Sequence, residues 1–309
     1  MTFVNVLWSD RSFGGAEIYT KKLDLEFSSV TVSLRNLSLK GWIYLIRNIL
    51  RKRQRFIFHD LRASLLNIFS LRRDNICVIH GPGKNLFFTR FMIIFLSQIS
   101  RNIVLVSDSL DTKLFNSRVK VVNNFSSNGI VADLTSKNAI YFGRIEKTKR
   151  IEEMISFWTS RHSPGDLHIV GGGSALEDLQ GKFQTKKSVK FHGPVNHDQI
   201  RQIANRCRYY ISFSVVEGLS LSLLEALNGG MIPLVAKIPS QVFLHNELGL
   251  PDVSDVNDDL YEIVGGLDNK NITTINGLSE SIKRLCETKF ERHWYEFWSD
   301  IALLDSELE

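Results

Sequence analysis

Short apolar runs that alternate with longer amphipathic stretches are the feature that most restricts the fold of this chain. The runs are rich in Val, Ile and Phe, and turn residues follow most of them. This pattern is typical of buried parallel strands in βαβ units. In the first half, strands are expected at residues 3–7, 30–34, 56–59, 76–80, 103–106 and 119–122. In the second half, they are expected at residues 139–142, 167–170, 188–191, 209–213, 233–235 and 261–264.

Two sets of strands predict an α/β protein with two doubly wound, Rossmann-like domains, each binding its ligand at the carboxyl ends of its strands. A polar stretch at residues 126–137 marks the boundary between them. We therefore expect an N-terminal domain over residues 1–133 and a C-terminal, ligand-binding domain over residues 134–278. Residues 279–309 are expected to form terminal helices that pack back toward the N-terminal domain.

The composition excludes several classes of protein. With 43% hydrophobic and 23% charged residues in a chain of 309, disorder is excluded. Cys77, Cys207 and Cys286 are too few and too scattered for a disulfide framework or a zinc cluster, so we expect buried thiols in a reducing cytosol. The sequence predicts neither a signal peptide nor a membrane-spanning helix, which needs about 18 apolar residues.

The net charge of +5 is unevenly distributed. Residues 1–133 hold 19 Lys and Arg against 9 Asp and Glu, whereas the remainder holds 19 against 24. This asymmetry indicates an anionic partner for the first domain. The sequence contains no recognised nucleic-acid-binding motif, so nucleic acid is not the expected partner.

A basic amphipathic helix is expected within residues 41–55. Such helices occur at membrane surfaces, but a Rossmann helix with ordinary solvated charges has the same pattern. Both interpretations hold together if Leu45 and Ile49 face the sheet while residues 51–53 meet anionic lipid. The neighbouring segment 84–99 is apolar on most sides and too short to span a bilayer.

Glu217 and Glu225 form the strongest chemical signal. A helix is expected to start near Ser220 and to stop at Gly229, with one carboxylate before it and the other inside it. The first N–H groups of such a helix suit a diphosphate, and carboxylates accept hydrogen bonds from sugar hydroxyls. The alternative is ordinary helix capping by Glu217 and a solvated Glu225.

Arg144 and Lys149 follow the strand expected at 139–142. Two cations at a strand end are suited to neutralise a diphosphate leaving group in place of a divalent metal. The sequence has no D-x-D or H-E-x-x-H motif, so neutralisation would fall to these cations and the helix N-terminus. The alternative is a solvated basic loop.

Glycines and one histidine mark three more strand ends. Gly14 and Gly15 precede a helix, where glycine lets the backbone approach a ligand, although the spacing is not that of a dinucleotide fingerprint. His80 lies at the end of its strand, a position taken by structural as well as ligand-binding histidines. The glycines at 171–173 form another turn after a strand.

With these motifs the chain resembles the retaining GT-B glycosyltransferases of family 4, the glycosyl transferases group 1. The resemblance follows the order of motifs over nearly the whole length and is most specific over residues 141–230. The matched motifs are E-x7-E at Glu217 and Glu225, G-R-[IL]-x-x-x-K at Gly143 to Lys149, I-V-G-x-G at 169–173, V-x-F-x-G at 189–193, G-G-x-E at 14–17 and the strand-end His80.

The resemblance implies a fold with the two domains facing a central cleft, and a role for each matched residue. Arg144 and Lys149 would hold the diphosphate of a nucleotide sugar, Glu217 the hydroxyls of the donor sugar and Glu225 the ribose. His80 would touch the donor sugar near the reacting carbon. The other implied donor-binding positions are Gly14 and Gly143, Gly15 where the first domain would close on the diphosphate, Leu219, Ser220 and Leu221 at the β-phosphate, and Gly193 and Val195 near the base.

The resemblance also implies an activity. A hexose would pass from a nucleotide-diphosphate sugar to a saccharide acceptor, expected to be lipid-linked, in bacterial O-antigen, capsule or exopolysaccharide synthesis. Retention by front-face attack is implied, with no metal or other cofactor, in the cytoplasm or at the inner face of the plasma membrane. Two departures from the family are Arg150, where Gly is usual, and Leu219-Ser220, where Phe-Gly is usual.

Two other classes stay open at this stage. One is a catalytically inactive GT-B subunit that serves as a binding or scaffold partner, against which the intact Arg144, Lys149, Glu217 and Glu225 argue. The other is a different enzyme on the same fold, such as a nucleotide-sugar epimerase, against which the E-x7-E spacing argues.

Overall fold

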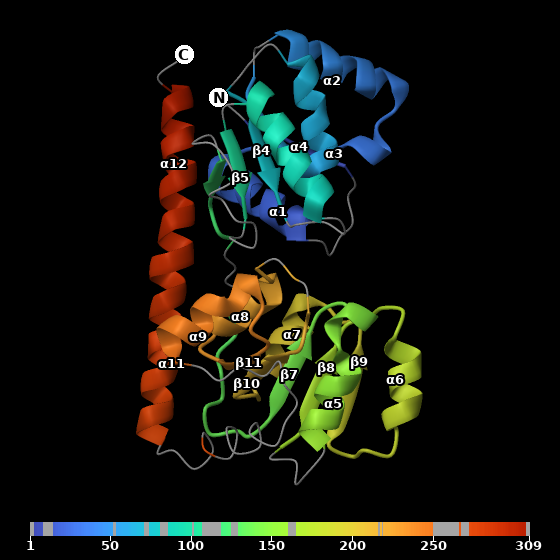
Figure 1. Ribbon diagram of the computed structural model, residues 1–309, viewed down its shortest axis with the longest axis vertical. Helices are drawn as coiled ribbons and strands as arrows, with labels where there is room; N and C mark the ends of the chain where they lie inside the picture. Colours follow the sequence, from blue (N-terminus) through green and yellow to red (C-terminus); the bar gives the residue numbers. More distant parts are fainter. Residues whose placement is uncertain are drawn as a thin grey trace. The chain divides into compact units, whose positions relative to one another are not determined.

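The computed structural model divides the chain into two units (Figure 1). The first unit is Met1–Asn124 with Arg292–Glu309, and the second is Phe125–Glu291. The structure describes residues 3–8, 15–51, 54–70, 74–80, 86–100, 102–106, 119–124, 129–159, 165–215, 217, 219–249, 266 and 272–306.

The first unit contains a parallel sheet of order β2-β1-β3-β4-β5-β6. Its strands are β1 (Val4–Leu7), β2 (Val30–Ser33), β3 (Phe56–His59), β4 (Ile76–Ile79), β5 (Asn102–Leu105) and β6 (Val119–Val121). Its helices are α1 (Gly15–Phe27), α2 (Leu39–Arg51), α3 (Asp60–Ser64), α4 (Leu86–Ile99) and α12 (Arg292–Ser306), with 3₁₀ turns η1 (Leu34–Asn36) and η2 (Leu65–Phe69). From β1 the strand order runs to β2 on one side and to β3 and the later strands on the other, so the order of this parallel sheet reverses between β1 and β3. Ligands are expected at such a reversal.

The second unit contains a parallel sheet of order β11-β10-β7-β8-β9. Its strands are β7 (Ala139–Phe142), β8 (Leu167–Val170), β9 (Val189–Gly193), β10 (Tyr209–Ser212) and β11 (Ile232–Val235). Its helices are α5 (Ile151–Thr159), α6 (Leu176–Phe183), α7 (His197–Ala204), α8 (Leu221–Asn228), α9 (Val242–Leu248) and α11 (Ile272–Cys286), with turns η4 (Lys147–Lys149), η5 (Pro239–Gln241) and the π-helical η6 (Glu287–Glu291). This order reverses between β7 and β10.

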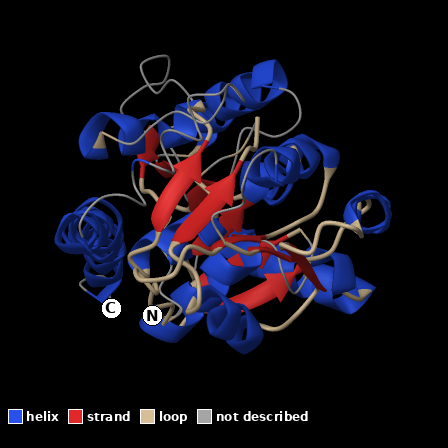
Figure 2. Ribbon diagram, turned by 90° about the horizontal axis from the view of Figure 1, so that it is seen from below, coloured by secondary structure: helices blue, strands red, loops and turns tan. Residues whose placement is uncertain are grey.

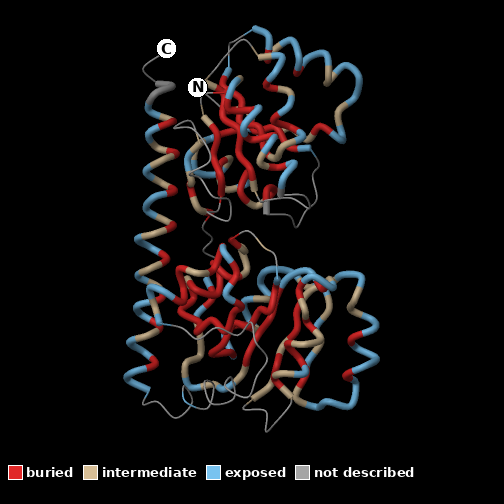
Figure 3. The backbone as a smooth tube through the Cα atoms, in the orientation of Figure 1, coloured by how far each residue is buried: buried red, intermediate tan, exposed pale blue. Residues whose placement is uncertain are grey.

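The predicted strands agree with the observed ones to within two residues, except that 261–264 lies outside the described residues. In Figure 2 the strands lie inside and the helices outside, and in Figure 3 the strands are largely buried. This arrangement explains why the runs are apolar on both faces: β3, β4, β7, β10 and β11 are buried at every position. The three cysteines are buried free thiols, and burial raises the pKa of each.

The units divide at Asn124, whereas the sequence places the boundary after residue 133. The described residues of this segment, 129–133, contact the second unit. Ala132 donates its N–H to the Gly229 carbonyl at 2.9 Å, and Asp133 donates to the Cys207 carbonyl at 3.2 Å. An added Cβ at Gly229 would lie 2.5 Å from Ile130, so that glycine gives the segment room.

The terminal residues 279–309 are shared between the units. Those up to Glu291 belong to the second unit, and α12 belongs to the first. Trp294 and Trp298 of α12 are fully buried, and Trp298 Nε1 donates to the Tyr19 hydroxyl of α1 at 2.8 Å. Tyr295 donates its hydroxyl proton to Glu26 at 3.0 Å. The last helix therefore completes the core of the first unit.

Candidate active site

The loops after β7 and β10 meet where the order of the second sheet reverses. The loop after β7 carries Arg144 and Lys149, and the loop after β10 carries Glu217. Val215 N–H donates to the Thr148 carbonyl at 3.4 Å, which joins the two loops. In doubly wound sheets, a crevice for ligands opens at such a reversal. Two motifs far apart in the sequence therefore meet at the expected ligand edge.

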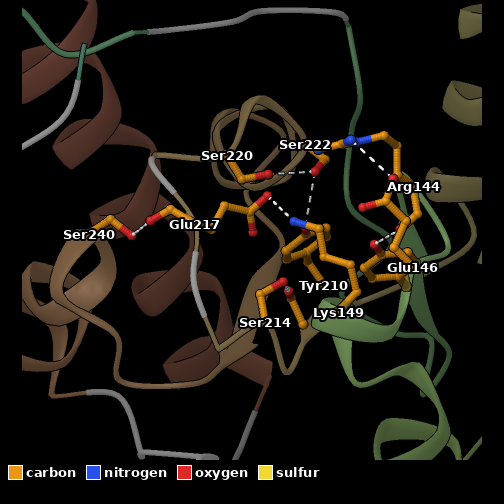
Figure 4. A network of polar contacts seen from close by, with 11 residues as sticks. Arg144, Glu146, Lys149, Tyr210, Ser214, Glu217, Ser220, Ser222 and Ser240 are labelled. Atoms are coloured by element: carbon orange, nitrogen blue, oxygen red, sulfur yellow. Dashed lines mark hydrogen bonds and ion pairs between the residues drawn. The ribbon is translucent and has the colours of Figure 1, made fainter. Parts of the chain in front are cut away.

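Lys149 and Glu217 form an ion pair across this edge (Figure 4). Lys149 Nζ lies 2.5 Å from Glu217 Oε1, and only 8% of Lys149 is exposed. The interpretation of this loop as solvated is therefore wrong for Lys149. That interpretation fits Arg144, whose guanidinium is exposed and lies 3.1 Å from Glu146 Oε1.

The N-terminus of α8 lies beside this pair (Figure 4). Ser220 is the N-cap residue, but its side chain makes no capping hydrogen bond. Ser220 Oγ lies instead 2.7 Å from Ser222 Oγ, which lies 3.1 Å from the Tyr210 hydroxyl. Glu217 does not act as the cap, because its carboxylate faces Lys149 and its carbonyl accepts from Ser240 Oγ at 2.8 Å. Among the residues that the structure describes, no side chain caps this helix end.

Glu225 lies inside α8 and is 4% exposed. The interpretation of Glu225 as a solvated carboxylate is therefore wrong. Burial, and then the Glu217 carboxylate, raise the pKa of Tyr210 well above its usual value, and Glu225 raises it further. Both carboxylates of the E-x7-E element thus act on one buried phenol, that of Tyr210 near the start of β10.

Glycines allow the loop after β7 to pass close to the loop after β8. Gly171 has φ +135°, and an added Cβ there would lie 1.8 Å from the Gly143 carbonyl oxygen. An added Cβ at Gly143 would lie 3.2 Å from the Tyr141 hydroxyl and 3.9 Å from Ser222 Oγ. Arg150, after Lys149, has the left-handed conformation with φ 49° and ψ 43°. This conformation explains why glycine suits that position.

Leu219, Ser220 and Leu221 lie at the start of α8, beside Glu217. Gly193 ends β9, where its carbonyl accepts from Gly171 N–H at 2.8 Å, and Val195 follows it half-buried. The structure therefore gathers most of the predicted donor-binding residues of the second unit along neighbouring strand ends.

The predicted residues of the first unit are His80, Gly14 and Gly15. Gly14 lies outside the described residues, and Gly15 begins α1. His80 follows β4, and its Nε2 lies 3.0 Å from His59 Nδ1. Burial lowers the pKa of His80 to about 4, against the opposing effect of the Glu17 carboxylate.

Sequence reasoning missed His59 and Asp60, which lie at the end of β3, beside the reversal point of the first sheet. Asp60 has φ 69°, and burial raises its pKa to about 6, opposed by Arg62. The signal was present, because His and Asp directly follow the run FIF.

No group of three or more His, Cys, Asp or Glu side chains is placed to hold a metal ion within the part of the chain that the structure describes. In the same residues, no helix has the length and apolarity that crossing a membrane requires.

Residues 123–249 match the family described as Glycosyl transferases group 1. The matched segment includes Lys149, Glu217 and Glu225. A curated relative, the O-antigen biosynthesis glycosyltransferase WbnH of Escherichia coli, is 35% identical over 99 residues, which are 31% of this chain and 27% of the relative. The GDP-mannose:cellobiosyl-diphosphopolyprenol alpha-mannosyltransferase of Xanthomonas oryzae pv. oryzae is 24% identical over 153 residues, or 43% of this chain and 38% of the relative. The matches thus span less than half of these relatives.

Among solved structures, Anabaena HepE in complex with UDP is similar with a TM-score of 0.76 at 14% identity, over 98% of this chain and 100% of that one. At this identity the likeness concerns the fold. Two parallel-sheet, Rossmann-like domains are the fold class of the GT-B glycosyltransferases, as the order of motifs predicts.

Proposed function

We propose that the protein is a retaining glycosyltransferase that moves a hexose from a nucleotide-diphosphate sugar to a saccharide acceptor. The observation that carries this proposal is the Lys149–Glu217 ion pair beside the start of α8, at the reversal point of the second sheet. A cation, a carboxylate and a helix N-terminus at one sheet edge match the diphosphate and the hydroxyls of such a donor. The match of residues 123–249 to the glycosyl transferases supports it.

In the proposed complex, the diphosphate competes with Glu217 for the ammonium of Lys149. Glu217 then turns to the hydroxyls of the donor sugar, and Glu225 serves the ribose. Arg144 is exposed, and Glu146 is its one ion-pair partner among the described residues, so it is able to turn toward the diphosphate without leaving a buried partner unpaired. The pair thus occupies the site until the donor replaces one of its members.

The proposed chemistry is front-face substitution with retention. The departing diphosphate takes up the proton of the acceptor hydroxyl, while Lys149, Arg144 and the α8 terminus stabilise its charge without a metal ion. Loss of one such contact costs about 3–4 kcal/mol in the transition state, or about 10²–10³ in rate.

The substrate class is proposed from the relatives. One relative is named for O-antigen biosynthesis and another for a diphosphopolyprenol-linked acceptor. We therefore assign this chain a lipid-linked saccharide acceptor in bacterial surface polysaccharide synthesis, at the cytoplasmic face of the membrane.

The test is a screen of UDP-, GDP- and TDP-hexoses, read first as protection against thermal unfolding and then as transfer to a polyprenyl-diphosphate saccharide. A donor at 100 times its Kd adds about 2.7 kcal/mol of stability. Lys149→Ala and Glu217→Ala should lose protection and turnover. Lys182→Ala is the matched control, because Lys182 forms an exposed ion pair with Glu152 outside the site. Donor binding without transfer to any acceptor would favour the inactive-subunit alternative, and wild-type turnover by Lys149→Ala would contradict the proposal.

The membrane part of the proposal is supported by the outer surface of the first unit. Large apolar side chains are exposed on α2, η2 and α4, and η2 contacts both helices. The exposed residues are Leu39, Ile43, Tyr44, Ile46 and Leu50 on α2, Leu65, Ile68 and Phe69 on η2, and Phe87, Phe88, Phe91, Ile94 and Phe95 on α4. Leu45 and Ile49 are buried against the sheet, as the sequence predicts, which leaves exposed Arg47 and Arg51 beside the apolar residues.

This combination of aromatic and basic side chains fits an anionic bilayer. In a flotation assay, vesicles with anionic lipid should carry the protein and neutral vesicles should not. Arg47→Glu with Arg51→Glu, or Phe87→Ser with Phe91→Ser, should release it. Lys186→Glu with Lys187→Glu, an equal charge change on exposed residues of the second unit, should not. A wild-type protein that never floats contradicts the membrane proposal and leaves the transferase proposal standing.

A further inference from the structure

Asn5, His59 and His80 form a line of hydrogen bonds that ends at the carboxyl edge of the first sheet. Asn5 lies in β1, His59 ends β3 and His80 follows β4. His59 Nε2 lies 3.0 Å from Asn5 Oδ1, and His59 Nδ1 lies 3.0 Å from His80 Nε2. A neutral imidazole has one donor and one acceptor nitrogen, so fixing one end of the line fixes every proton in it.

Asp24 fixes the inner end. Its Oδ1 accepts from Asn5 Nδ2 at 2.8 Å and also from the Ser29 hydroxyl, and its Oδ2 accepts from Thr31 Oγ1 at 2.6 Å. An ionised carboxylate only accepts, so the amide nitrogen of Asn5 must face Asp24. The amide oxygen of Asn5 must then face His59.

The protons follow from this orientation. His59 donates from Nε2 to Asn5, so its Nδ1 is the acceptor, and His80 must donate to it from Nε2. His80 Nδ1 is left with a lone pair, and no hydrogen bond to that atom is recorded among the described residues. Burial lowers the pKa of both rings. At His59, repulsion from a protonated His80 lowers the pKa further. Both imidazoles are therefore neutral at pH 7.

Tyr19 holds the ring of His80 in place. The two rings meet edge to face with centroids 5.2 Å apart, and Tyr19 is fully buried. The hydroxyl of Tyr19 accepts from Trp298 Nε1. His80 therefore has a fixed ring plane as well as a fixed hydrogen-bond partner.

We propose that Asp24, acting through Asn5 and His59, holds His80 in the single tautomer that offers Nδ1 as an acceptor, so that His80 binds a ligand hydroxyl and not a phosphate. A phosphate oxygen at neutral pH is itself an acceptor, whereas a sugar hydroxyl donates a proton to a bare nitrogen. The assignment of that hydroxyl to the donor sugar rests on the proposed function. The tautomer of His80 does not depend on the proposed function. Asp24, Asn5 and His59 are positioning residues.

A second histidine pair in the chain serves as an internal comparison. His168 Nδ1 lies 2.9 Å from His192 Nε2, and the ring centroids are 5.2 Å apart, against 5.3 Å for His59 and His80. Among the described residues no amide or carboxylate is recorded in a hydrogen bond to either of these rings. The pair in the second unit is therefore expected to exchange between tautomers.

The test is a long-range ¹H–¹⁵N NMR spectrum of the histidine-labelled full chain at pH 7, which separates protonated from bare ring nitrogens. His59 and His80 should each show a protonated Nε2 and a bare Nδ1, and His168 and His192 should show averaged shifts. Asp24→Asn lets the Asn5 amide turn over, so both tautomers of His59 and His80 should appear. Thr31→Val removes one hydrogen bond to Asp24 but keeps its charge, so the wild-type pattern should stay.

The same variants link the tautomer to the ligand. Asp24→Asn should raise the donor-sugar KM about tenfold, the worth of about one hydrogen bond, while Thr31→Val leaves it unchanged. A wild-type His80 that is charged at pH 7 or protonated at Nδ1 overturns the inference, even in an active transferase. An Asp24→Asn spectrum identical to the wild-type spectrum also overturns the inference. The expected spectra in a protein that turns over no nucleotide sugar uphold the tautomer and overturn the proposed function instead.

Discussion

Lys149 Nζ and Glu217 Oε1 lie 2.5 Å apart, although 68 residues separate them in the sequence. The contact exists because β7 and β10 are neighbours in a sheet whose order reverses between them. The side chains are only 10% and 20% exposed, so the pair is desolvated more than a surface ion pair. Removing one member leaves the other charge partly buried without its partner, which costs more than the pair itself contributes.

A double-mutant cycle should detect this coupling. Lys149→Met and Glu217→Gln should each lower the free energy of unfolding, and the double variant should lose less than the sum, with a coupling of about 1–3 kcal/mol. Chemical denaturation of the four proteins measures it. The exposed pair Lys182 and Glu152 should show no measurable coupling in a parallel cycle. Additive losses at Lys149 and Glu217 would show that the pair does not interact in solution.

Glycine at position 150 should relieve the strain of a left-handed backbone. Its left-handed backbone costs about 1–2 kcal/mol for a side chain with a Cβ, and part of the gain from glycine is offset by the freedom of the unfolded chain. Both Arg150→Gly and Arg150→Ala remove the side chain that contacts Glu153. Because only alanine keeps the backbone strain, Arg150→Gly should be about 1 kcal/mol more stable than Arg150→Ala. Thermal unfolding of the two variants decides it, and equal melting temperatures would refute the strain.

Asp60 should make stability depend on pH. Its pKa is raised from 3.8 to about 6, so the folded protein binds the proton more tightly than the unfolded chain. Protonation of Asp60 therefore adds about 1–3 kcal/mol to the free energy of unfolding below about pH 4. This contribution is lost as pH rises through 6. Asp60→Asn tolerates the left-handed backbone and should abolish this loss. Urea unfolding at pH 4.5 and pH 7 measures the difference, and parallel pH dependences would contradict it.

Gly171 and Gly181 should respond in opposite directions to alanine. At Gly171 the new Cβ would meet the Gly143 carbonyl at 1.8 Å, so the loop that carries Lys149 has to move, at a cost above about 3 kcal/mol. Gly181 lies in α6 with nothing within 4 Å of an added Cβ, and alanine there should stabilise the protein by up to about 1 kcal/mol. Melting temperatures test both. A Gly171→Ala protein as stable as wild type would show that the two loops do not pass so closely.

The sequence predicts the strands and the E-x7-E element because each depends on local pattern. Apolar runs identify buried strands wherever they fall, and the spacing from Glu217 to Glu225 is set by a turn and one helix. The direction in which Arg144 points does not follow from its motif, because its partner Glu146 competes with the expected ligand for its guanidinium.

His59 was missed for a different reason. Its importance comes from its neighbours in space, since the pairing of β3 with β4 and with β1 brings His80 and Asn5 to its two nitrogens. The sequence shows that His59 follows an apolar run, but no spacing within it predicts which side chains the strand pairing brings to the ring of His59. The conformation of Arg150 is similar: the departure from the family's glycine is visible in the sequence, but the left-handed turn that gives it meaning is not.

The hydrogen bond from Trp298 to Tyr19 has a consequence for protein synthesis. The ribosome adds Trp298 279 residues after Tyr19, which at about 5–20 residues per second takes roughly 15–60 s. During that interval the second unit, whose residues Phe125–Glu291 are continuous in the chain, emerges entire. The unit that is translated first is therefore the last to be completed, and Tyr19 stays uncovered by Trp298 until α12 is made.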